Sequence, residues 1–195
     1  MHHRLKLVSG DMIERYKGDS KAILVQQNNC TSLKLRPDSL AEQIARVFYH
    51  GDDPYTRRKY GIYENLAIPE RRQKMGQVMI YRRYNPPMAG VACLFAQYKM
   101  GRPDAKYYLN GRRTDPEYVE NATKLDSGRH RLAAFRKCLS KLGGYLSEGE
   151  GINVDKVIFP YRIGCGAGGG SWPLYRRAIS DFSETVDVDV IICKK

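Results

Sequence analysis

The sequence predicts a three-layer α/β domain, with a central sheet between two layers of helices. Short apolar runs typical of buried strands alternate along the chain with amphipathic helical patterns, and no internal repeat or low-complexity tract interrupts them. A length of 195 residues is enough to bury a substantial core in one domain. We therefore expect a single domain over residues 1–195, with ligands bound near the carboxyl ends of the strands.

The expected elements follow from hydrophobic periodicity and turn residues. Strands are predicted in the apolar segments 5–8, 22–25, 76–81, 91–97, 157–163 and 186–193. Helices are predicted at 40–48, where Asp38 or Ser39 can cap, at 128–146, and at 172–182, where Ser171 is expected to cap. Residues 12–16 are expected to form a short turn. The segment 98–126 has no clear period and is expected to be a long surface excursion.

Composition limits the partners, the location and the kinds of site that we expect. The net charge of +12 favours polyanionic partners, nucleic acid among them. No apolar run is long enough to cross a bilayer or to act as a signal peptide, so we expect no membrane association and an intracellular protein, cytoplasmic or nuclear. The five cysteines are widely spread and form no C-x-x-C pair, which favours reduced, buried thiols over a zinc site. We expect a monomer without metal or cofactor.

Residues 157–173 hold the most informative motif. An apolar run at 157–163 precedes a segment with five glycines between Gly164 and Gly170, and Ser171, Trp172 and Pro173 then start a helix. A strand, a glycine-rich loop and a helix start together form the arrangement that cradles phosphate, because glycine lets backbone N–H groups approach an anion closely. The alternative is a merely flexible loop.

A second unusual segment is rich in amides. Gln26, Gln27, Asn28 and Asn29 follow the apolar run at 22–25 without a break. Buried amides need hydrogen-bond partners, so the amide-rich loop expected at Gln27 to Ser32 either fixes neighbouring backbone or holds a polar ligand. Both loops are expected at strand ends, where together they could bind the two ends of a phosphorylated, hydroxyl-rich molecule.

Other phosphate motifs fit less well. A P-loop requires a lysine before the Ser/Thr, and Gly170-Ser171 lacks it. A dinucleotide fingerprint would need an acidic residue at the end of the next strand, whereas Asp187 and Asp189 are expected inside one. No G-x-S-x-G is present. Cys165 could be a reactive thiol near a helix start, although a small residue chosen for its size is the favoured interpretation.

These motifs, in this order, resemble those of the macrodomain family, whose fold binds ADP-ribose. Similar are Val8 to Met12, the Ile23 to Cys30 strand with its asparagine, the Leu40 helix start, and the Val91 to Gln97 strand. The most specific similarity is the phosphate loop, Ile163 to Trp172. The resemblance implies an α/β/α fold with a central mixed sheet. The most similar branch contains ADP-ribose-1″-phosphate phosphatase-like proteins.

The resemblance also implies a ligand and roles for residues. The ligand would be ADP-ribose or an ADP-ribosylated macromolecule, with Asp11 at the adenine and Asn29 at the distal ribose. It implies hydrolysis of a bond at the distal ribose C1″, with Asn29 as the catalytic residue. The residues it assigns to ligand binding are Asp11, Met12, Gln27, Asn29, Cys30, Ser39, Ile163, Gly164, Cys165, Gly166, Ala167, Gly168, Gly169, Gly170 and Ser171.

The sequence departs from the family pattern at several places. The first ligand loop, 33–39, is poor in glycine. Ser171 stands where relatives carry an aspartate before the tryptophan, and Cys193 stands where an aromatic residue lies under the adenine. Lys99 is near the position of a lysine used by some relatives. The alternatives to an enzyme are therefore a non-catalytic reader of ADP-ribosylated targets, a basic nucleic-acid-binding module, or a scaffold that has lost the ligand.

Overall fold

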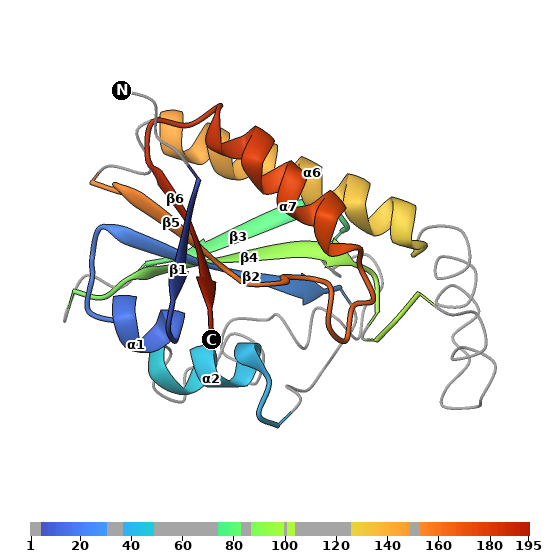
Figure 1. Cartoon of the computed structure of the whole chain (residues 1–195), viewed down its shortest axis with the longest axis horizontal. Coiled ribbons are helices and arrows are strands. Elements are labelled where there is room, and N and C mark those ends of the chain that lie inside the picture. Colours follow the sequence, from blue (N-terminus) through green and yellow to red (C-terminus); the bar gives the residue numbers. More distant parts are fainter. Residues whose placement is uncertain are drawn as a thin grey trace.

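A mixed sheet forms the middle layer of the protein (Figure 1). The computed structural model describes residues 5–30, 37–48, 74–82, 87–99, 101–103, 126–148 and 153–195. Within these residues the strand order is β1-β6-β5-β2-β4-β3. The strands are β1 (Lys6–Ser9), β2 (Ala22–Asn29), β3 (Gln77–Tyr81), β4 (Gly90–Gln97), β5 (Lys156–Pro160) and β6 (Asp189–Lys194). All neighbouring pairs are parallel except β3 and β4.

Helices cover both faces of the sheet, which confirms the predicted three-layer α/β/α architecture with a mixed sheet. In Figure 1, α6 (Gly128–Ser147) and α7 (Trp172–Ser183) lie on one side, and α1 (Met12–Tyr16) and α2 (Leu40–Phe48) lie on the other. Two buried clusters correspond to these layers. Phe135 and Tyr175 belong to the first, and Ile13 and Ile44 belong to the second.

Strand β2 shows how one sequence fills both layers. Its side chains alternate between the faces, so that Ile23 and Val25 join the α6–α7 cluster while Ala22 and Leu24 join the α1–α2 cluster. Strand β4 is buried at every position, as expected for an interior strand covered on both faces. No helix in the described part of the chain is both long and apolar enough to cross a membrane.

Several element boundaries differ from the sequence prediction. The amides of 26–29 are not in a loop: they continue β2, because β4 lies alongside and pairs with it as far as Asn29. Residues 12–16 form a helix rather than a turn, since the Asp11 carboxylate accepts hydrogen bonds from the N–H groups of Ile13 and Glu14. Strand β5 ends at Pro160, three residues before the predicted end.

The last strand also begins later than predicted. Val186 and Val188 are buried, so their alternation with polar residues did indicate burial. The ladder with β5 nevertheless starts only at the pair of Lys156 and Asp189, which leaves Asp187 outside the strand. An apolar alternation reports which side chains are buried, but it does not report whether the backbone has a neighbour to pair with.

The expected surface excursion at 98–126 is buried at both ends. Lys99 and Asp126 are each 2% exposed, because Asp126 accepts backbone hydrogen bonds from Tyr98 and Lys99 at the end of β4. Residues 104–125 lie outside the described residues, as do 31–36, which hold most of the first ligand loop.

Candidate functional site

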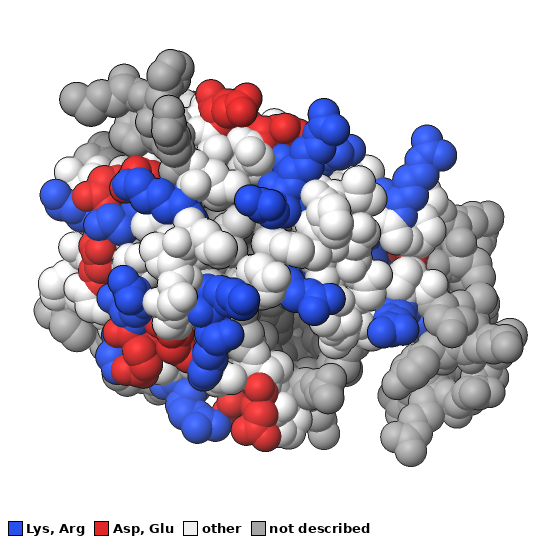
Figure 2. Space-filling model, viewed as in Figure 1, with Lys and Arg blue, Asp and Glu red and all other residues white. Residues whose placement is uncertain are grey.

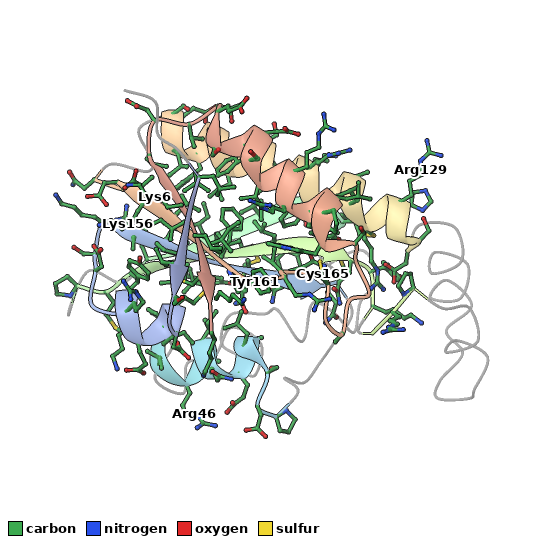
Figure 3. All side chains as sticks on the ribbon, in the orientation of Figure 1. Lys6, Arg46, Arg129, Lys156, Tyr161 and Cys165 are labelled. Carbon is green, nitrogen blue, oxygen red and sulfur yellow. The ribbon has the colours of Figure 1, made fainter. Side chains whose placement is uncertain are left out.

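The glycine loop, residues 164–170, lies at the carboxyl ends of the parallel strands. It connects the end of β5, at Pro160, to the start of α7, at Trp172. Figure 3 labels Tyr161 and Cys165, which mark the first half of this connection. Strand β2 ends on the same side of the sheet as β5, because the two are parallel neighbours. The topology therefore places the glycine loop beside the amides at the end of β2, as the sequence predicted.

A polar floor lies directly under the glycine loop. The Gln27 side chain of β2 donates from Nε2 to Gln97 Oε1 of β4 at 2.9 Å. The Tyr175 ring of α7 completes the floor. A Cβ at position 164 would lie 2.5 Å from Gln27 Oε1 and 2.7 Å from Tyr175 Cε1, and one at position 170 would lie 2.7 Å from Tyr175 Cε2. Glycine is required at both positions because the floor leaves no room for a side chain.

Internal hydrogen bonds hold the loop but leave part of it available. Gly170 donates its N–H to Gly164 O at 3.0 Å, and Gly169 donates to Gly166 O at 3.1 Å. Among the described residues, the N–H groups of Gly166, Ala167 and Gly168 have no acceptor. A run of such donors beside a helix N-terminus attracts an anion.

Gly166 differs from the glycines that rest on the floor. A Cβ at position 166 would meet nothing within 4 Å, and the residue is exposed and lacks a positive φ. Among the described residues, neither packing nor backbone conformation requires glycine there. The open position leaves room for a molecule to approach the backbone closely from outside.

The titratable groups of the loop are neutral at physiological pH. Burial raises the pKa of the Cys165 thiol to about 11, and the thiol donates to Ile163 O at 3.2 Å. This disfavours a reactive thiolate. Burial likewise raises the pKa of Tyr175 to about 12. Gln27 lies close enough to lower that pKa in part, although the Tyr175 hydroxyl and Gln27 Oε1 make no hydrogen bond of good geometry.

Asn29 and Cys30 lie at the end of β2 with different surroundings. Asn29 pairs with Gln97 across the β2–β4 ladder just after a register shift, and it is half-buried. Cys30 is fully buried and its N–H donates to the carbonyls of Gln97 and Tyr98, at 3.1 and 3.0 Å. Burial raises the pKa of the Cys30 thiol far above its usual value. Asn29 is thus the better placed of the two to contact a ligand.

Asp11 lies two strands away from the glycine loop, after β1. Its Oδ2 accepts a hydrogen bond from Lys195 Nζ at 2.7 Å, while its Oδ1 caps α1. The hydrogen bond from Lys195 holds the pKa of Asp11 below its usual value against the effect of burial. Met12, the next residue, is 4% exposed and packs in the α1–α2 cluster.

Two serines assigned to the ligand stand at helix starts. Ser39 Oγ accepts the Glu42 N–H at 3.2 Å, which confirms the predicted cap of α2. Ser171 occupies the N-cap position of α7, but its side chain makes no capping hydrogen bond, so that prediction is wrong for its side chain. Its hydroxyl is exposed beside the glycine loop. Because the Ser171 hydroxyl makes no capping hydrogen bond, it is available to a ligand.

Two floor residues were not singled out in the sequence. Gln97 ends an apolar run and Tyr175 lies in the apolar stripe of α7, so a local pattern explains each of them. A polar residue at the carboxyl end of an interior strand was the available signal for Gln97. Tyr175 gave no comparable signal, since nothing near it in sequence indicates that its ring supports a loop.

Basic residues are spread over the surface. Helix α6 carries exposed Arg129, Arg136, Lys137 and Lys141 and contains no acidic residue. On the face seen in Figure 2, Lys and Arg side chains are scattered and are mixed with Asp and Glu. The Lys and Arg side chains on this face do not form one continuous patch.

Comparison with known proteins gives structural but not sequence matches. No family model matches the chain, and neither does any curated protein. Among solved structures, a Bacteroides thetaiotaomicron protein of unknown function superimposes with a TM-score of 0.66 at 17% identity, covering 100% of both chains. The macrodomain of Mycobacterium tuberculosis DarG gives a TM-score of 0.60 at 18% identity, covering 97% of this chain and 96% of that one.

A third match was solved with a ligand. Thermosipho africanus DarTG in complex with ADP-ribose gives a TM-score of 0.53 at 15% identity, covering 97% of this chain and 42% of that one. Identities this low establish a shared fold and nothing finer. The sheet order, the two helical layers and these superpositions agree, and the chain has the macrodomain fold.

Proposed function

We propose that the protein binds ADP-ribose or one of its derivatives, with the diphosphate against the glycine loop. The observation that carries the proposal is the row of N–H groups at Gly166, Ala167 and Gly168, which have no acceptor among the described residues and lie beside the start of α7. Gly166 adds to it, because its open Cβ position suits a ligand that approaches the backbone closely. The fold supports it, since a structure of similar fold holds ADP-ribose.

The remaining contacts follow from where the strands end. Asn29, at the end of β2, would contact the distal ribose, and Asp11, after β1, would contact the adenine amino group through a carboxylate that is ionised at neutral pH. The order β1-β6-β5-β2 places the glycine loop between these two residues. The parts of ADP-ribose follow the same order: the adenine would lie at Asp11, the diphosphate at the glycine loop and the distal ribose at Asn29.

Hydrolysis at the distal ribose C1″ is the activity proposed for this site, with a water oriented by Asn29. Neither Cys165 nor Tyr175 can serve as a general base at neutral pH, because burial raises the pKa of both. Ser171 is not a base either. Water would therefore be activated through the substrate's own phosphate, and a reader without hydrolase activity is the alternative.

The binding proposal is tested with a charge at the open glycine position. Gly166→Asp places a carboxylate where the phosphates would lie, and Gly166→Asn is its neutral control of equal size. Because position 166 is open, both variants should fold like the wild type. We expect calorimetry with ADP-ribose to give a dissociation constant at least about tenfold larger for the Asp variant than for the Asn variant, from charge repulsion. No binding by the wild type, or equal affinities, contradicts the proposal.

Release of inorganic phosphate distinguishes a hydrolase from a non-catalytic reader of ADP-ribose. With ADP-ribose-1″-phosphate as substrate, a hydrolase releases inorganic phosphate, and Asn29→Ala should abolish the release while Arg129→Ala, on the exposed surface of α6, retains it. If the wild type binds ADP-ribose but releases no phosphate, the protein is a reader and not a hydrolase of this substrate.

A nucleic acid is the second candidate partner, and one observation favours it. The exposed basic residues of α6, with no acidic residue between them, form a surface that suits a phosphate backbone. Binding of a single-stranded oligonucleotide should weaken steeply as salt rises from about 50 to 200 mM, and Arg129→Glu with Arg136→Glu should abolish it. Binding that is insensitive to salt contradicts this candidate.

A further inference from the structure

A buried ion pair lies behind the glycine loop. Arg131 of α6 is 1% exposed and Asp126 is 2% exposed. The guanidinium meets the carboxylate with two parallel hydrogen bonds, Nε to Oδ1 and Nη2 to Oδ2, both 2.6 Å. Such a fork fixes the orientation of both groups. A charge pair this deep persists only when its remaining donors and acceptors are also satisfied.

The other donors of Arg131 all reach main-chain carbonyls. Nη1 donates to Gly101 O at 2.5 Å and to Gly168 O at 2.9 Å, and Nη2 donates to Lys99 O at 3.4 Å. With the two bonds to Asp126, all five N–H donors of the guanidinium are used. One side chain thus connects α6 to two separate parts of the backbone: the segment after β4, through the carbonyls of Lys99 and Gly101, and the glycine loop, through that of Gly168.

Asp126 extends the connection to β4. Its two oxygens accept the N–H groups of Tyr98 and Lys99, at 3.0 and 3.2 Å. The end of β4 is the same place from which Gln97 supports the floor of the glycine loop. The ion pair and the floor are therefore joined through the backbone of 97–99, and Gln97 Nε2 itself donates to Lys99 O at 3.0 Å.

Gly168 is the point at which the pair contacts the loop. A Cβ there would lie 2.5 Å from Gly164 O and 3.1 Å from Gln97 Oε1, so the Gly168 backbone already rests against the floor. Arg131 holds its carbonyl on the inner side. Gly168 directly follows Gly166 and Ala167, and the N–H groups of these three residues are the donors of the loop that have no acceptor among the described residues.

We infer that Arg131, oriented by Asp126, is a positioning residue that holds the glycine loop in its anion-binding shape through Gly168 O. The loop then meets a ligand with its N–H groups already arranged, and no ordering cost is incurred on binding. This inference rests on the proposed function for its ligand, whereas the effect of Arg131 on the free loop does not depend on it.

The test compares Arg131→Lys with Leu142→Ala. The lysine keeps the charge, but it lacks the planar guanidinium that meets both oxygens of Asp126, and its three donors cannot make all five bonds. Leu142 lies in the same helix, is fully buried, and is far along the sequence from the loop, so its truncation lowers stability without touching Gly168. Two quantities are measured in each variant: hydrogen exchange, without ligand, of the Gly169 and Gly170 amides, which are hydrogen-bonded within the loop, and the dissociation constant of ADP-ribose.

We expect Arg131→Lys to exchange these amides at least about tenfold faster than the wild type and to bind ADP-ribose at least about tenfold more weakly, while Leu142→Ala changes neither. If Arg131→Lys does not fold, Asp126→Asn serves, because it removes one charge and leaves the guanidinium its carbonyl partners. Wild-type exchange in a folded Arg131→Lys or Asp126→Asn, or equal loosening by Leu142→Ala, overturns the inference. Faster loop exchange together with no ADP-ribose binding by the wild type would instead count against the proposed function.

Discussion

At the scale of single residues, the glycines of the loop are required for different reasons. Gly164 has a positive φ of 71° and rests on Gln27 and Tyr175, whereas Gly166 lacks a positive φ and a Cβ added to it would meet nothing within 4 Å. The sequence shows both as the same letter. The structure separates a glycine that packing and backbone conformation require from one that has open space around its Cβ position among the described residues.

This difference predicts opposite outcomes for two matched substitutions. Gly164→Ala should lower the free energy of unfolding by about 2–4 kcal/mol, from overpacking against the floor and from a left-handed backbone at a residue with a Cβ. Gly166→Ala should change it by less than about 0.5 kcal/mol, because the new methyl group enters open space. Urea unfolding of both variants measures the difference. Equal losses would mean that the floor does not pack as described.

The contacts of the site were less predictable than its glycines. A run of residues without side chains is visible in any sequence, so the loop was identified directly. The hydrogen bond of Gln27 to Gln97 joins residues 70 apart, and no local pattern indicates such a partner. Arg131 was one basic residue among many until the structure placed it next to Asp126, which had been assigned to a surface excursion.

At the scale of elements, the two serines that begin α2 and α7 provide a comparison. Ser39 Oγ accepts a backbone hydrogen bond and the Ser171 side chain accepts none. Sequence alone assigned a capping role to both, since serine is favoured at N-caps whether or not its hydroxyl is used. The distinction depends on side-chain geometry, which periodicity does not contain.

We therefore predict that Ser39→Ala costs about 1 kcal/mol of stability, while Ser171→Ala costs less than about 0.5 kcal/mol. Ser39→Asp is the control, because aspartate is also a good cap and should keep near wild-type stability. Chemical denaturation of the three variants decides between these outcomes. A loss in Ser171→Ala as large as in Ser39→Ala would show that the Ser171 hydroxyl caps α7 in solution.

Strands were predicted where apolar character marked them and missed where pairing alone defined them. Strand β4 is apolar up to Gln97, its last residue, and was predicted within one residue. The polar half of β2 was assigned to a loop, because only the neighbouring β4 backbone makes it a strand. Helix α6, with its long stripe of buried apolar residues, was predicted within one residue at its carboxyl end.

At the scale of the whole molecule, buried acids with raised pKa values determine how stability depends on pH. Burial raises the pKa of Cys165 to about 11, of Cys138 to about 12 and of Tyr175 to about 12. These groups stay protonated in the folded protein at a pH where the unfolded chain has released their protons. Unfolding is then favoured by each proton released.

The free energy of unfolding should therefore be unaffected by these groups below about pH 8 and should fall as the pH rises from about 9 towards 11. Urea unfolding at pH 8 and at pH 10.5 measures the fall. Cys138→Ala is the control: it removes one titrating group and should reduce the pH dependence. An equal free energy of unfolding at the two pH values would contradict the burial of these side chains.

The place of β1 in the sheet has a consequence for how the chain is synthesised. Strand β1 lies at the sheet edge with β6 as its neighbour, and its Lys6 contacts Asp189, 183 residues later. Among the described strands only β6 pairs with β1, so β1 has no partner in this sheet until residues 189–194 have been made. The sheet can assemble outward from β2, β4 and β5, and β1 can join it only after β6 appears. Closing a contact this distant in sequence is slow, and we expect β1 to be one of the last strands to pair during synthesis.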